Sequence, residues 1–245
     1  MNSKWLAILL MMASCGAFAD TLGVKFGLQH WQADNTGYVG EADDAVLSWS
    51  SDSQNQIRIY GSIEHPIFLI PNVKMGYSKF DFEDIALLDQ TYRLGGQLYS
   101  IASELNYGGE YEIVDFISYY EIVDRDILSF DLGVNFRFQD TEYQVADVNS
   151  GANSQTSVSS IEPLFYAKLT SSLPLMGLFS YFEYQTGDKN HDYETAIGYQ
   201  FSENMLAAIT VYIGYKDQQI SYQYEDGIVA KAEWNSVFVS LESSF

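Results

Sequence analysis

From Leu128 to Phe138 every second residue is apolar, and the residues between them are polar or glycine. Successive side chains of a β-strand point to opposite faces, so this pattern gives a strand with one wholly apolar face. A helix, with 3.6 residues per turn, would mix the two sets on every face. The apolar members are Leu128, Phe130, Leu132, Val134, Phe136 and Phe138.

The same two-residue period recurs along the chain. It marks ten segments, 21–31, 56–64, 73–82, 111–123, 127–138, 158–170, 177–186, 192–202, 205–217 and 233–245. Segments of about ten residues with alternating polarity are typical of transmembrane barrel strands.

The connections between these segments alternate in length. At one end they are the polar stretches 32–55, 83–110, 139–157, 187–191 and 218–232, and at the other they are the short turns 65–72, 123–126, 171–177 and 202–204. Outer-membrane barrels have this asymmetry, with long external loops and short periplasmic turns. An open sheet edge would leave backbone groups unpaired in hydrocarbon, so the sheet must close. We predict an all-β fold, a single closed antiparallel transmembrane β-barrel of about ten strands, with eight or twelve strands as the alternatives.

The N-terminal segment 1–19 predicts a cleaved signal peptide. Lys4 precedes an apolar run that ends in small residues and the triplet Ala17-Phe18-Ala19. A lipoprotein signal with Cys15 as the lipidated residue is the alternative, because Met12-Ala13-Ser14-Cys15 is similar to a lipobox. Cleavage after Ala19 leaves the barrel domain 20–245 without cysteine, which excludes disulfides and cysteine-based metal sites.

Charge and hydropathy narrow the possible partners and the location. The chain has 12 Lys and Arg against 33 Asp and Glu, which argues against nucleic acid as a partner. No apolar run after residue 19 approaches the roughly 20 residues that a membrane-spanning helix needs. We therefore expect an integral protein in the outer membrane of a Gram-negative bacterium, with outer-membrane lipid and lipopolysaccharide as its partners.

The last segment alternates up to its final residue. Its expected lipid-facing side chains are Val237, Val239, Leu241 and Phe245. This ending resembles the C-terminal insertion signal of outer-membrane barrels, which implies recognition by the barrel assembly machinery. Ser243 departs from that pattern, because an aromatic or aliphatic residue is usual there. An ordinary final strand of a soluble β-sandwich is the alternative.

Three stretches resemble one family of small proteobacterial outer-membrane β-barrel proteins. They are Glu64-His65-Pro66 with Leu69-Ile70-Pro71-Asn72-Val73-Lys74, then Tyr119 to Asp124 leading into Phe130-Asp131-Leu132-Gly133, and the last strand. Phe68 stands where that motif usually has a second proline. The resemblance implies localisation and fold, but the family has no established activity, so it implies no mechanism.

Charged residues on the polar face of the segments predict a charge network in the barrel lumen. Facing lipid would cost about 2 to 4 kcal/mol for a basic side chain at the membrane midplane. Both signs are present, which favours mutual pairing over a selective pore. The network members are Lys25, Arg58, Glu64, Lys74, Asp115, Glu121, Asp131, Arg137, Glu162, Lys168 and Glu183, with Glu194 and Lys216 on the same face.

Bulky and small residues share this inward face. Barrels of about eight strands have an interior just filled by side chains, whereas open channels need 16 to 18 strands. Alternation of large and small side chains suits a narrow, filled lumen. We therefore predict a non-enzymatic protein, structural or with a narrow or plugged channel, that has acidic external loops at 41–44, 81–84 and 188–194.

The alternative function is a barrel enzyme, of the protease or lipid A-modifying type, with a site at the extracellular rim. His191 beside Asp192 suggests it, and His30 is a second position. Adjacent residues of a strand point to opposite faces, so His191 and Asp192 alone do not form a catalytic pair. The third histidine, His65, is predicted to cap a proline-bounded turn. No catalytic residue, metal site or cofactor is predicted.

Overall fold

A computed structural model describes residues 22–245 except 43, 68, 174–175, 205–206 and 224–226. The expected signal peptide 1–19 lies outside the described residues. The described part of the chain has no helix that is long and apolar enough to cross a bilayer.

Ten antiparallel strands form a closed barrel, as predicted. In spatial order they run β1, β12, β11, β10, β9, β8, β7, β6, β3 and β2, and β2 returns to β1. The bounds are β1 Gly23–Glu41, β2 Val46–Glu64, β3 Asn72–Leu87, β6 Glu104–Arg125, β7 Leu128–Asp147, β8 Asn153–Leu173, β9 Leu178–Thr186, β10 His191–Asn204, β11 Ala207–Gln223 and β12 Ile228–Ser244. A separate hairpin, β4 (Tyr92–Leu94) with β5 (Gln97–Tyr99), lies between β3 and β6 in sequence.

The strands are longer than predicted. Most of the polar stretches 32–55, 139–157 and 218–232, expected to be loops, belong to strands, and the acidic stretch 81–84 lies within β3. The reason is a reversal of polarity along each strand. Near the short turns apolar side chains point outward, whereas towards the other end they point inward and polar side chains face outward.

Strand β12 shows this reversal clearly. Val237 and Val239 are exposed on the outer face, while Ser240 on the opposite face is buried. Further up the strand Trp234 and Ala232 are buried, and the charged Glu233 lies on the outer face. The change marks where the outer surface passes from lipid to water.

The outer face near the short turns carries a continuous set of exposed apolar side chains. Exposed apolar surface of this extent on a closed barrel is the lipid-facing belt of an outer-membrane protein. The chain is therefore an integral outer-membrane β-barrel, and the end with short turns is periplasmic. The belt includes Phe26, Leu28, Ile57, Ile59, Val134, Phe136, Phe138, Phe182, Ile197, Ile213, Val237, Val239, Leu241 and Phe245.

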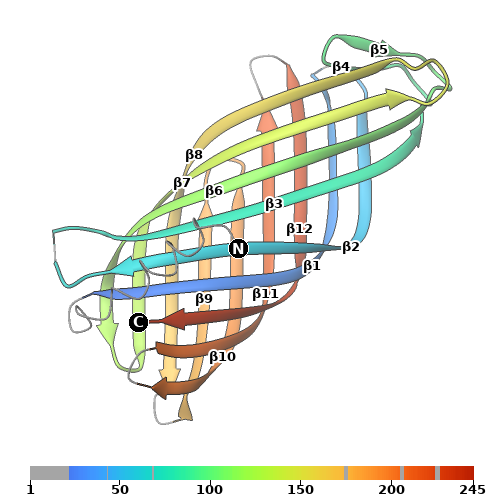
Figure 1. Cartoon of the computed structure of the whole chain (residues 1–245). Helices are drawn as coiled ribbons and strands as arrows, with labels where there is room; N and C mark the ends of the chain where they lie inside the picture. The colour runs from blue at the N-terminus through green and yellow to red at the C-terminus, as the bar shows by residue number, and fades with distance from the viewer. Residues whose placement is uncertain (1–21, 43, 68, 174–175, 205–206, 224–226) are drawn as a thin grey trace, which may run out of the picture.

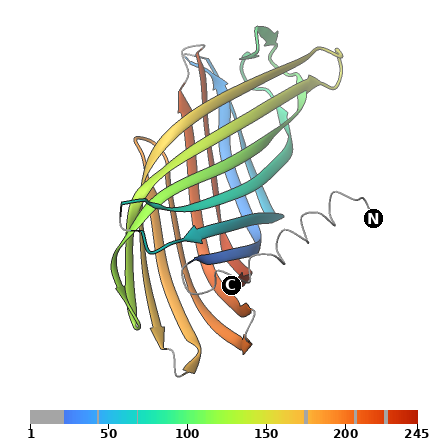
Figure 2. The same ribbon diagram turned by 60° about the vertical axis from the view of Figure 1, so that its left-hand side comes forward.

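Above the belt the barrel wall divides into two sheets. Pairing of β2 with β3 ends at Ile57 and Lys79, and pairing of β8 with β9 ends at Phe165 and Thr186. Strands β3, β6, β7 and β8 then lean across β1, β2, β11 and β12 at an angle, as both views show (Figures 1 and 2). The extracellular half is therefore a two-sheet extension of the barrel.

Within the belt, aromatic rings pack against glycines of the neighbouring strand. Gly27 lies opposite Tyr60, and Gly198 lies opposite Tyr212. A Cβ atom at Gly27 would lie 2.0 Å from Cζ of Tyr60, so only glycine fits beside that ring. Large and small inward residues therefore interlock across the strands.

We expect Gly27→Ala to lower the free energy of unfolding by about 1–3 kcal/mol, the usual effect of overpacking. Urea unfolding in phospholipid vesicles, followed by tryptophan fluorescence, would measure it. Gly23→Ala is the matched control, because its added Cβ would meet no atom closer than 3.5 Å. Equal stability of the two variants would contradict the proposed packing.

Candidate functional site

The lumen is the candidate site, and its periplasmic end holds the first ion pair. Nζ of Lys25 lies 2.8 Å from Oε1 of Glu64, which also accepts a hydrogen bond of 2.9 Å from the hydroxyl of Tyr119. Glu121 lies near a β-bulge of β6 and accepts a hydrogen bond of 3.2 Å from Asn72. These contacts connect β1, β2, β3 and β6 near the periplasmic rim.

The middle of the lumen is crossed by a buried set of charges centred on Arg137, which is fully buried. Its Nε lies 2.7 Å from Oδ1 of Asp115, and its Nη2 lies 2.5 Å from Oδ2 of Asp192. One guanidinium therefore joins β6 to β10 across the barrel interior.

Further pairs extend this set. Arg58 lies 3.4 Å from Asp115 and 3.6 Å from Glu194, and Lys216 lies 3.6 Å from Glu194. Lys74 and Glu183 form a pair of 2.6 Å. We name these eight residues the ionic layer. It has four cations and four anions, so its formal charges cancel; its members are Arg58, Lys74, Arg137, Lys216, Asp115, Glu183, Asp192 and Glu194.

Three other predicted network residues have different surroundings. Nζ of Lys168 lies 4.9 Å from the ring centroid of Tyr181, and Glu162 accepts a hydrogen bond from the amide of Asn190. Asp131 is buried. Among the residues that the structure describes, these three form no ion pair within 4.0 Å. The sequence pattern does not predict Asp192 as a network member, although it lies two residues before Glu194 and therefore on the same face of β10.

Above the ionic layer the space between the two sheets is filled by aromatic side chains. Trp234 stacks on Phe80 with ring centroids 4.6 Å apart, and Phe80 meets Trp31 edge-on at 5.5 Å. Trp49 and Phe82 stack at 3.9 Å. We call this set, with its buried neighbours, the aromatic core. The sequence pattern predicts loops at or close to these positions. The structure differs because the apolar alternation continues there with its faces exchanged.

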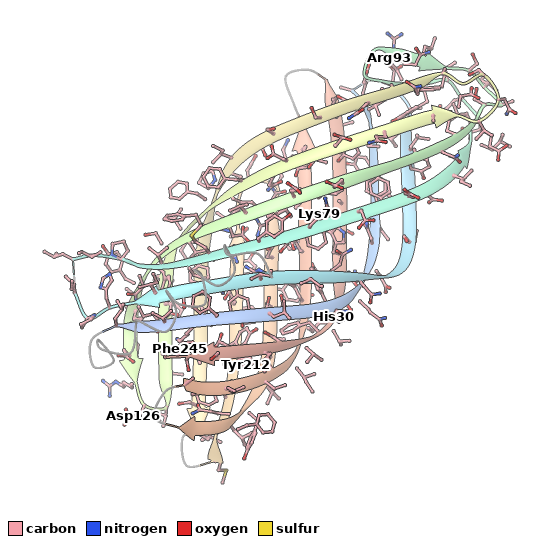
Figure 3. The ribbon with its side chains drawn as sticks, viewed as in Figure 1. His30, Lys79, Arg93, Asp126, Tyr212 and Phe245 are labelled. Atoms are coloured by element: carbon pink, nitrogen blue, oxygen red, sulfur yellow. The ribbon has the colours of Figure 1, made fainter. Side chains whose placement is uncertain are left out.

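The hairpin β4–β5 caps the aromatic core. The hydroxyl of Tyr92 donates to the carbonyl oxygen of Val39 at 3.4 Å, and that of Tyr99 donates to Val145 at 3.1 Å. One hairpin thereby bonds to both sheets. Burial raises the pKa of Tyr92 above its ordinary value, so it remains a neutral donor at physiological pH. Arg93 of the same hairpin is exposed at the extracellular tip, and Asp126 lies at the opposite end of the molecule (Figure 3).

The histidines do not assemble a catalytic centre with their predicted neighbours. Nε2 of His191 lies 3.5 Å from Oδ1 of Asp217, while Asp192 points inward to Arg137. His30 lies on the outer face of β1 between Val239 and Ile57. His65 accepts a hydrogen bond from the amide of Ile67 at 3.2 Å, in the turn where it was expected as a cap.

No protein-family model matches the sequence, and no curated protein matches it. The chain is similar in structure to the outer-membrane protease OmpT from Escherichia coli, with a TM-score of 0.47, 10% identity and coverage of 92% of this chain and 97% of that one. Ail from Yersinia pestis, in complex with sucrose octasulfate, has a TM-score of 0.42, 8% identity and coverage of 92% and 99%. The translocator domain of the autotransporter NalP from Neisseria meningitidis has a TM-score of 0.41, 11% identity and coverage of 96% of both chains. The resemblance to the small proteobacterial family stays a prediction.

Proposed function

We propose that this protein is a sealed, non-enzymatic barrel that anchors a rigid two-sheet extension at the cell surface. The observation that most directly supports this proposal is that side chains fill the lumen in two successive layers. Within the membrane the ionic layer crosses the interior, and outside it the aromatic core occupies the space between the sheets. A solute would have to displace paired charges and then closely packed rings.

The electroneutrality of the ionic layer supports a plug rather than a selective filter. A pore that selects ions presents a ring of charge of one sign to the permeating ion. Here each cation of the ionic layer has a carboxylate within 4.0 Å, so the charges of this layer compensate one another. Direct pairing also reduces the large desolvation penalty of isolated charges.

The non-enzymatic part of the proposal rests on the position of the histidine–carboxylate pair at the rim. His191 and Asp217 lie on the outer face of β10 and β11, and the structure gives His191 no hydrogen bond from a serine or threonine hydroxyl among the described residues. Lipid and lipopolysaccharide around the belt, and the barrel assembly machinery during insertion, are the partners that we propose for the membrane part. The protein's specific role then belongs to the extension.

We expect the purified, folded protein to give no stable conductance in planar lipid bilayers, or only small flickering steps. A general porin in the same membrane serves as the positive control. Different gel mobility before and after boiling would confirm that the sample is a folded barrel. Stable conductance comparable to that of the porin would contradict the sealed lumen.

A further inference from the structure

The extracellular part of β8 has a neighbour on one side only. Strand β8 pairs with β7 from Asn153 to Ser171, but its pairing with β9 begins only at Phe165. Among the described strands, none pairs with residues 153–164 on the other side. In Figure 1, β8 is the outermost strand of the leaning sheet.

Both ends of this edge are covered, but its middle is not. At the top, Gly95 of the β4–β5 hairpin lies against the carbonyl oxygen of Gln155. At the bottom, Asn190 donates to Glu162 and accepts a hydrogen bond of 2.6 Å from the amide of Ser221. The uncovered stretch is therefore Thr156–Ile161, which we call the β8 edge.

The β8 edge lacks the features that normally protect a free strand. Native proteins block sheet edges with charged residues, prolines or bulges. The other free edge of the same sheet, at 80–87 of β3, has Asp81, Glu83 and Asp84. The β8 edge reads Thr-Ser-Val-Ser-Ser-Ile and has neither charge nor proline within it; Glu162 and Pro163 follow at its membrane end. The two edges of one sheet thus differ in their protection.

We propose that the β8 edge binds an extended segment of a partner protein by strand addition, and that this segment alternates basic and apolar side chains. Added strands gain affinity from main-chain hydrogen bonds and specificity from alternate side chains. The inference rests on the proposed function, in which the extension carries the protein's specific role. It deepens that function by naming the class of partner that the extension binds.

The basic character follows from the outer face beside the edge. Glu142 and Asp140 of β7 lie opposite Ser157 and Ser159 on the outer face. The added strand would lie two strand spacings of about 4.8 Å from β7, a gap that a long basic side chain and a β7 carboxylate extended towards each other can close. On the inner side Val158 already packs against the aromatic core, which favours apolar residues there.

A second copy of this chain does not fit the same edge. Two barrels in one membrane are related by an axis along the membrane normal, which makes their β8 strands run in the same direction. Across such an axis each residue faces its own equivalent, so identical backbone groups oppose each other. In a parallel ladder the residues that face each other are offset by one position, so the two edges do not pair. The net charge of −21 on each chain adds repulsion.

The test uses the full-length protein in detergent micelles and a fluorescent nine-residue peptide of alternating valine and lysine. We expect saturable binding by fluorescence polarisation, and slower amide hydrogen exchange at 156–161. A peptide of the same composition with its lysines grouped at one end, and one with glutamate in place of lysine, are expected to bind at least about tenfold more weakly.

Val158→Lys places an inward charge on the edge and is expected to weaken binding about tenfold. Ile85→Lys, which adds the same charge at an exposed position of β3, is the matched control and is expected to bind normally. If Val158→Lys does not show the mobility of a folded barrel, Ser160→Lys on the same face replaces it.

Three outcomes would overturn the proposal. They are equal binding of the grouped peptide, unchanged exchange at 156–161, and a dimer of the protein that Val158→Lys dissociates. Each is independent of bilayer conductance, so failure of strand addition and failure of the sealed lumen are distinguishable.

Discussion

Arg137→Gln is expected to lower the free energy of unfolding by about 3–5 kcal/mol, as removal of one partner from a buried ion pair usually does. The substitution removes the guanidinium that joins Asp115 to Asp192. Asp115 keeps Arg58 at 3.4 Å, whereas Asp192 has no other cation within 4.0 Å among the described residues. Both carboxylates are buried, so water cannot replace the lost hydrogen bonds without opening the barrel. Urea unfolding in vesicles, followed by tryptophan fluorescence, measures the change.

Lys79→Gln is the matched control for the loss of one cation. Lys79 pairs with Glu110 at 2.5 Å on the outer face, where both side chains are nearly half exposed. Exposed pairs of this kind contribute little to stability, because water and salt screen their charges. Adding Asp192→Asn to Arg137→Gln should restore part of the stability, because one buried charge disappears. A loss below about 1 kcal/mol for Arg137→Gln would contradict the role of the ionic layer.

Trp234→Ala is expected to destabilise the extracellular extension by about 3–5 kcal/mol, the usual effect of truncating a buried tryptophan. Trp234 is fully buried, stacks on Phe80 and meets Tyr111 edge-on at 4.9 Å. Its removal leaves a cavity between the two sheets. The expected result is faster cleavage of the extension by external protease on intact cells, while the boiling-dependent gel mobility of the membrane part persists.

Ile85→Ala provides the comparison for this effect. Ile85 lies on the outer face of β3 and is exposed, so its truncation should change stability by no more than about 0.5 kcal/mol. If external protease cleaved both variants at the rate of the unchanged protein, the aromatic core would not be what holds the two sheets together.

The sequence predicted the membrane part of the fold well. Val134, Phe136 and Phe138 alternate with Asn135 and Arg137, and the strand β7 places these two sets on opposite faces of the barrel wall. Prediction failed above the membrane, where Trp31 and Trp234 lie in or beside segments assigned to loops. An apolar residue there faces the interior instead of lipid, so the apolar face no longer indicates the outside of the barrel.

The sequence by itself determined the period of the strands, the closure of the sheet and the set of charges that cannot face lipid. Each of these follows from local polarity and from the exclusion of unpaired backbone groups from hydrocarbon. Only the tertiary structure decided that Arg137 meets Asp192, 55 positions away in sequence. Only the tertiary structure decided, too, that residues 153–164 of β8 do not pair with β9. Contacts across a barrel depend on the register and the divergence of distant strands. A two-residue period specifies the face of each side chain but not the residue that lies opposite it.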